Sequence, residues 1–158
     1  AVANHLLLIA IAMVAGFLGM GAIAERLGRI GVKTVHVAMA GMSLFMCVQV
    51  LLAAQWTALA LPAWMLFGFF GASGILSYAA LPQGFPPELA GRVITGLNVF
   101  TFLGAFAAQW GIGLIINLWP VAAGGGYSPE GYQAAFWMMI GLQGLGLTWY
   151  MIFRKSSI

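Results

Sequence analysis

The sequence has 158 residues, of which 63% are hydrophobic and only 6% are charged, and its mean hydropathy is +1.01. A soluble domain carries about 25% charged residues, so the composition excludes an ordinary water-soluble protein. The net charge is +3, but the six Lys and Arg residues fall in three separate places between or after apolar segments. That spacing gives no basic patch and argues against nucleic-acid binding.

The first predicted helix covers residues 5–24, close to the roughly 20 residues that cross a bilayer. A basic loop follows, in which Gly28 and Gly31 can end the helix and turn the chain. The second predicted helix covers residues 34–55. Trp56 then suits the aromatic belt at a membrane–water interface, so we expect a short turn there.

The third predicted helix covers residues 58–81, and its centre is rich in small residues, so it should pack tightly or bend. The fourth covers residues 87–118 and is longer than a perpendicular crossing requires. The fifth covers residues 129–153, with Ser128 as N-cap and Pro129 at the first helical position. The predicted fold is therefore all-α, a polytopic membrane bundle of five transmembrane helices in one unit over residues 1–158.

Charge predicts the direction of every predicted helix. All six basic residues fall on one side of the five-helix arrangement: Arg26, Arg29, Lys33, Arg92, Arg154 and Lys155. Loops rich in Lys and Arg stay in the cytoplasm. We therefore expect the N-terminus of the chain outside and its C-terminus in the cytoplasm.

Two of the predicted loops carry recognisable residue orders. The first reads Gly21-Ala-Ile-Ala-Glu25-Arg26-Leu-Gly28-Arg29, which resembles the cytoplasmic loop signature of the major facilitator superfamily of secondary transporters. The family usually has Asp where this chain has Glu25. Phe85-Pro-Pro-Glu-Leu-Ala-Gly-Arg92 is similar to the loop before the family's eleventh helix, and Tyr132-Gln-Ala-Ala-Phe136 is similar to segments of its bacterial members.

By helix order, the chain resembles helices eight to twelve of such a transporter, which form most of its C-terminal half. The resemblance implies secondary active transport of a small solute by alternating access, in which one half rocks against the other. Its partners would be the N-terminal half, membrane lipids and the small-molecule substrate, in the bacterial inner (plasma) membrane. Because the chain begins Ala-Val-Ala-Asn without an initiator Met, we expect it to be a piece of a longer protein.

The resemblance also assigns roles to the loop residues. Glu25, Arg26 and Arg29 would form a charge-assisted cluster that bridges the two halves while the cytoplasmic gate is shut. Gly21, Gly28 and Arg92 complete the two loop motifs. The alternative, equally weighted, is that these charges are solvated anchors of topology.

Candidate substrate contacts follow from the same resemblance, which places the third predicted helix at the central cavity and the fourth beside the seam between halves. Trp64, Phe67 and Tyr78 share one face of the third helix; Asn98, Thr101 and Gln109 share one face of the fourth. Such polar side chains equally often hydrogen-bond to a neighbouring membrane helix. The three acidic residues, Glu25, Glu88 and Glu130, fall at helix ends or in loops, so a proton-coupling acid is expected outside this chain.

Other function classes find less support. Ser73 and Ser77 are possible nucleophiles, but His5 and His36 lie near opposite helix ends and no carboxylate within a span could orient them, so we expect no enzyme. His5, His36 and the single Cys47 have no partners at metal-ligand spacing, and we expect no metal and no cofactor. The more serious alternative is a membrane scaffold or an oligomeric channel subunit with no transport cycle of its own.

Overall fold

The computed structural model describes residues 2–122 and 124–153. All regular elements in these two segments are helical, as predicted. They are α1 (Val2–Gly28), α2 (Thr34–Ala53), α3 (Ala60–Gly71), α4 (Leu76–Ala80), α5 (Ala90–Ile116) and α6 (Pro129–Phe153), joined by short 3₁₀ turns. The described residues contain five helices long and apolar enough to cross a membrane, with α3 and α4 forming one of them over Ala60–Gly84 and α5 extended to Pro87–Ile116.

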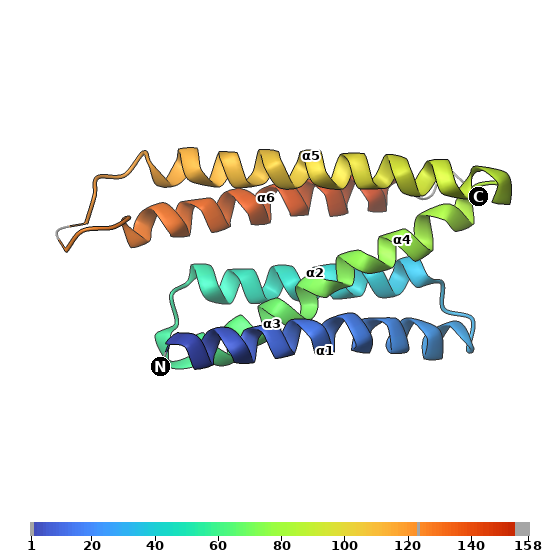
Figure 1. Ribbon diagram of the computed structural model, residues 1–158, viewed down its shortest axis with the longest axis horizontal. Coiled ribbons are helices and arrows are strands. Elements are labelled where there is room, and N and C mark those ends of the chain that lie inside the picture. Colours follow the sequence, from blue (N-terminus) through green and yellow to red (C-terminus); the bar gives the residue numbers. More distant parts are fainter. Residues whose placement is uncertain (1, 123, 154–158) are drawn as a thin grey trace.

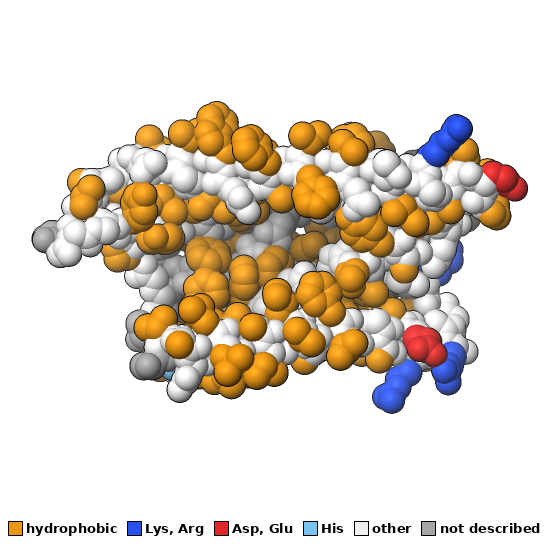
Figure 2. Space-filling model, in the orientation of Figure 1, with side chains coloured by type: hydrophobic (Ala, Val, Ile, Leu, Met, Phe, Trp, Pro, Cys, Tyr) orange, Lys and Arg blue, Asp and Glu red, His pale blue; other side chains and the backbone are white. Residues whose placement is uncertain are grey.

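The five long helices run alternately up and down the long axis of the molecule (Figure 1). Helix α1 packs along α3, and α2 packs against both α3 and α6. Helices α5 and α6 form a hairpin, and α5 contacts the rest of the bundle mainly through α6 and the turns before its own start. The described Lys and Arg side chains lie at one end of the long axis (Figure 2); Arg154 and Lys155 lie outside the described residues.

Helix α1 ends later than predicted, at Gly28 instead of residue 24. The expectation that Glu25 and Arg26 lie in a loop was therefore wrong. The chain turns at Gly31, whose φ is +88°, while Val32 N–H bonds to the Leu27 carbonyl and Gly31 N–H to the Gly28 carbonyl, both at 3.0 Å. This pair of bonds is a Schellman motif. The motif needs one residue in the left-handed backbone conformation, which glycine adopts without strain.

The third membrane-length helix is interrupted at its small-residue centre. Helix α3 gives way to a 3₁₀ segment, η2 (Ala72–Ile75), before α4 resumes. The prediction that this centre would pack tightly is confirmed. A Cβ at Gly68 would lie 3.0 Å from the Ile9 carbonyl oxygen, and one at Gly16 would overlap the backbone of Phe69. Glycines on both helices thus let α1 and α3 approach closely.

Candidate functional site

The basic motif forms an exposed cationic tip at the end of α1. Arg29 donates to Glu25 at 2.6 Å, one helical turn away, and the two side chains are 75% and 68% exposed. A Cβ added at Gly21 or Gly28 would meet no atom within 4 Å, so no described element packs there. Exposed pairs of this kind contribute little to stability. Any role of Glu25 and Arg29 therefore depends on their charge and exposed position more than on the stability that their ion pair adds.

A polar cluster joins the third and fourth membrane-length helices. The Tyr78 hydroxyl on α4 donates to Asn98 Oδ1 on α5 at 2.8 Å, and lies 3.4 Å from Thr101 Oγ1. A phenol has one proton, so the shorter contact to Asn98 takes it and Thr101 is the secondary partner. The structure thus brings together three of the predicted cavity residues. The two N–H bonds of the Asn98 side-chain amide make no hydrogen bond to the described residues.

The aromatic part of the predicted face lies in a separate cluster. Ring centroids of Trp64 and Phe67 are 5.3 Å apart, and Phe67 also meets Phe45 of α2 at 4.8 Å and Phe136 of α6 at 6.3 Å. These are the offset and edge-to-face separations that aromatic rings prefer. Gln109 joins neither group. It is exposed on α5 and hydrogen-bonds to none of the described residues.

The most buried polar contact was not predicted from the sequence. Gln49 of α2 is only 2% exposed, and its amide pairs with that of Gln143 on α6. Gln49 Nε2 donates to Gln143 Oε1 at 3.1 Å, and Gln143 Nε2 donates to Gln49 Oε1 at 3.0 Å. The only signal in the sequence is that each glutamine interrupts an apolar segment, which does not reveal its partner 94 residues away.

Another unanticipated amide completes the end of α2. Gln133 Nε2, in the second turn of α6, donates to the Ala53 carbonyl oxygen at 2.7 Å. The last carbonyls of a helix have no partner within that helix, and in a membrane an unpaired carbonyl is costly. Gln133 therefore both caps α2 and joins it to α6.

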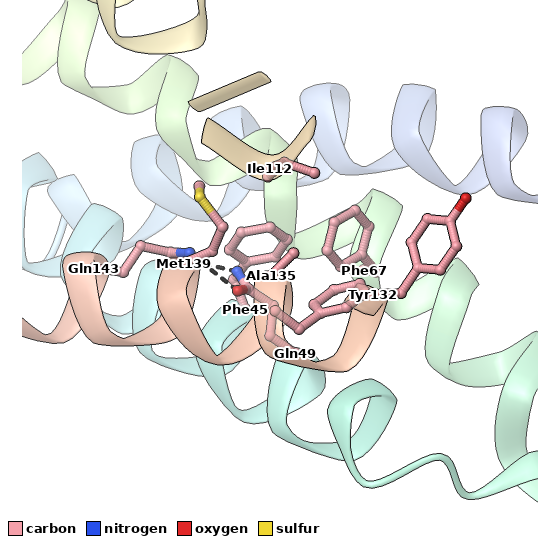
Figure 3. Close-up of a pocket in the computed structure, with 9 residues that line it drawn as sticks. Phe45, Gln49, Phe67, Ile112, Tyr132, Ala135, Met139 and Gln143 are labelled. Atoms are coloured by element: carbon pink, nitrogen blue, oxygen red, sulfur yellow. Dashed lines mark hydrogen bonds between the residues drawn. The ribbon is translucent and has the colours of Figure 1, made fainter. Parts of the chain in front are cut away.

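A cavity of about 270 Å³ lies beside the glutamine pair (Figure 3). Its walls come from α2, α3, α5 and α6, and are mostly aromatic and aliphatic: Phe45, Phe67, Ile112, Tyr132, Ala135, Phe136 and Met139, with the two glutamines. Phe67 is the one predicted substrate residue in its wall. No Asp, Glu, Lys, Arg or His lines it.

The remaining chemistry-bearing residues are dispersed. Within the described ranges, no three His, Cys, Asp or Glu side chains gather closely enough to hold a metal ion. Ser77 donates to the Gly74 carbonyl at 2.6 Å, whereas Ser73 Oγ is buried without a hydrogen-bond partner. Comparison with family profiles, curated proteins and solved structures finds no match to this chain.

Proposed function

We propose that this protein is part of the C-terminal half of a secondary transporter that resembles the major facilitator superfamily and moves a small solute by alternating access. The proposal rests above all on the hydrogen-bonded cluster of Tyr78, Asn98 and Thr101 inside two membrane-length helices. Polar groups at such depth are expensive, and in membrane proteins they face a bundle interior or a water-filled path.

The exposure of α5 supports the same proposal. Ile116 is the one buried residue of this helix, and Gln109 and Thr101 on it are exposed. A polar amide facing lipid lacks hydrogen-bond partners, which costs free energy. A second transporter half lying against this face would cover Gln109 and place Asn98 at the seam between halves, where substrate sites of such transporters form.

In this proposal the tip formed by Glu25, Arg26 and Arg29 lies in the cytoplasm of a bacterial cell, at its inner membrane, with Arg92 on the same side of that membrane. The exposed Glu25–Arg29 pair is then available to exchange partners with the other half. Closing the cytoplasmic gate would bring a new acid or base to this pair, and opening would restore the contact within α1.

The first test is the length of the native gene product. The proposal expects about seven further helices upstream, the number that completes two six-helix halves, with a similar basic loop between the second and third. The whole protein, reconstituted in liposomes, should then take up at least one solute from a panel of radiolabelled sugars, amino acids and nucleosides.

Asn98→Ala should lower that uptake at least about tenfold, the effect of losing about 1.4 kcal/mol of interaction. Thr95→Ala is the matched control, because Thr95 is exposed on the same helix and its hydroxyl donates to the Gly91 carbonyl at 2.9 Å. Equal uptake by both variants would mean that the polar cluster takes no part in transport.

The alternative is a scaffold or an oligomeric channel subunit, and the sparse burial of α5, in which only Ile116 is fully buried, supports it too, because a second copy could cover that helix. A native product that starts near Ala1, forms discrete oligomers of defined mass and takes up no solute from the panel would establish this alternative in place of transport.

A further inference from the structure

The cavity beside Gln49 and Gln143 shares only Phe67 with the candidate substrate residues. Trp64, Tyr78, Asn98, Thr101 and Gln109 do not line it. Its walls join the second half of α2 to residues 132–143 of α6, with α3 and Ile112 of α5 on the other sides (Figure 3). The cavity therefore does not include the hydrogen-bonded cluster of Tyr78, Asn98 and Thr101, and binding there can be measured separately from transport.

The aromatic wall is formed before any ligand arrives. Phe67 lies at its centre, with Phe45 at 4.8 Å and Phe136 at 6.3 Å between ring centroids. Trp64 supports both from behind, 5.3 Å from Phe67 and 6.1 Å from Phe136. Each ring limits the rotation of the next, so binding a flat molecule here costs little side-chain entropy.

The amides of Gln49 and Gln143 are largely occupied with each other. Each gives one N–H and accepts at its oxygen through two hydrogen bonds, which leaves one side-chain N–H on each, and the Tyr132 hydroxyl points away from the pair (Figure 3). With no charged residue in the wall, a charged ligand would lose its hydration without compensation. The chemistry of the cavity selects for an uncharged, apolar molecule.

We propose that this cavity binds a neutral aromatic molecule of two fused rings. An apolar protein cavity of about 150 Å³ stays dry and binds benzene, and this cavity, at about 270 Å³, has room for a second ring. Several ring edges and faces directed at one space favour an aromatic ligand over a saturated one of equal size, by about 0.5–1.5 kcal/mol for each aromatic pair.

The methionine methyl groups offer a direct readout. Met139 lines the cavity, whereas Met13 is exposed on α1, away from it. The intact protein, labelled with ¹³C-methyl methionine and held in lipid nanodiscs, is titrated with naphthalene, and the two methyl signals are assigned with Met139→Leu and Met13→Leu. We expect a saturable ring-current shift of the Met139 signal, and for Met13 only the weak, non-saturating change of a solute that partitions into lipid.

Decalin, the saturated counterpart of naphthalene, separates aromatic recognition from simple filling by hydrocarbon. From the decalin concentration that reverses the Met139 shift, we expect decalin to bind at least about fivefold more weakly than naphthalene, which corresponds to about 1 kcal/mol. Equal displacement by decalin would overturn the proposal and assign the cavity to any hydrocarbon, lipid acyl chains included. A Met139 shift that never saturates would overturn it as well.

Two variants locate the binding. Ile112→Trp fills the cavity from α5 and should abolish the saturable shift, while Leu114→Trp, two residues along and 49% exposed, should preserve it. Phe67→Leu keeps the wall apolar but removes the central ring, and should weaken naphthalene binding without filling the space. Unchanged binding in both Ile112→Trp and Phe67→Leu would overturn the proposal, whatever the outcome of the transport assays.

Discussion

At the scale of single residues, the chain combines a satisfied and an unsatisfied buried polar group. Gln49 and Gln143 hydrogen-bond to each other, whereas Ser73 Oγ is buried without a hydrogen-bond partner. Buried polar groups without partners cost free energy, while removing both partners of a pair is much less costly. An apolar substitution at Gln49 should therefore lower the free energy of unfolding, whereas one at Ser73 should leave it unchanged or raise it.

Gln49→Leu should destabilise the protein by about 1–2 kcal/mol, because it breaks two interhelical hydrogen bonds of about 0.6 kcal/mol each and strands the Gln143 amide. The double variant Gln49→Leu/Gln143→Leu should recover part of that loss. Reversible unfolding in mixed micelles measures both values. Gln109→Leu, on exposed α5, should not lower the free energy of unfolding, and strictly additive losses at Gln49 and Gln143 would contradict the pairing.

Ser73→Ala should leave the free energy of unfolding unchanged or raise it by up to about 1 kcal/mol, because the lost hydroxyl has no hydrogen bond to forfeit. Ser77→Ala is the matched comparison, one turn along, and should lower stability slightly because Ser77 donates to the Gly74 carbonyl. If Ser73→Ala were the more destabilising of the two, the hydroxyl would have a partner in solution.

At the scale of elements, glycine contacts hold the first and third membrane-length helices together. Gly16 faces the backbone of Phe69 and Gly68 faces that of Ile9, so α3 is fixed against α1. Beyond the 3₁₀ segment η2, Leu76 of α4 is still buried against Met20 and Ala24 of α1, and Tyr78 adds a hydrogen bond from α4 to α5. The interruption therefore changes the local helix geometry at the point where the third membrane-length helix gains its contact with α5.

Gly16→Ala should destabilise the protein by about 1–3 kcal/mol, the usual cost of overpacking, because the added Cβ would overlap the backbone of Phe69. Gly21→Ala is the matched control on the same helix, since no atom lies within 4 Å of its added Cβ. Thermal unfolding of both variants in detergent measures the difference. Equal melting temperatures would mean that α1 and α3 are further apart than described.

At the scale of the whole molecule, charge is distributed unequally between the two ends. The described Lys and Arg side chains lie at one end (Figure 2), and Glu130 begins α6 after the loop at the other. The proposed topology, which follows the positive-inside rule, has the basic end in the cytoplasm. This asymmetry makes the orientation of the chain directly testable.

Cysteine labelling tests the orientation. With Cys47, the only cysteine, replaced by Ser, Tyr127→Cys should react with a membrane-impermeant maleimide on intact spheroplasts, because Tyr127 is exposed in the α5–α6 loop. Lys33→Cys should react only after the membrane is opened. The reverse pattern would invert the proposed topology and place the Glu25–Arg29 tip outside the cell.

Much of the architecture was predictable because its signals are local. Five membrane-length helices follow from the length and hydropathy of consecutive residues, and the start of α6 at Pro129 follows from Ser128 and Pro129 beside each other. The end of α1 was misplaced because the apolar run stops at Ala24, whereas the helix continues through the charged residues Glu25 and Arg26 to Gly28. The left-handed turn at Gly31, which lets Val32 bond back to Leu27, then ends it.

The sequence alone determined that this is a chain of five apolar helices with the described basic residues at one end, because bilayer thickness and charge act on each segment separately. Tertiary structure decided which polar side chains meet. Gln49 finds Gln143 and Gln133 finds the Ala53 carbonyl only when α2 and α6 pack together. The aromatic cavity likewise needs four helices at once, since its ligand-sized space belongs to none of them individually.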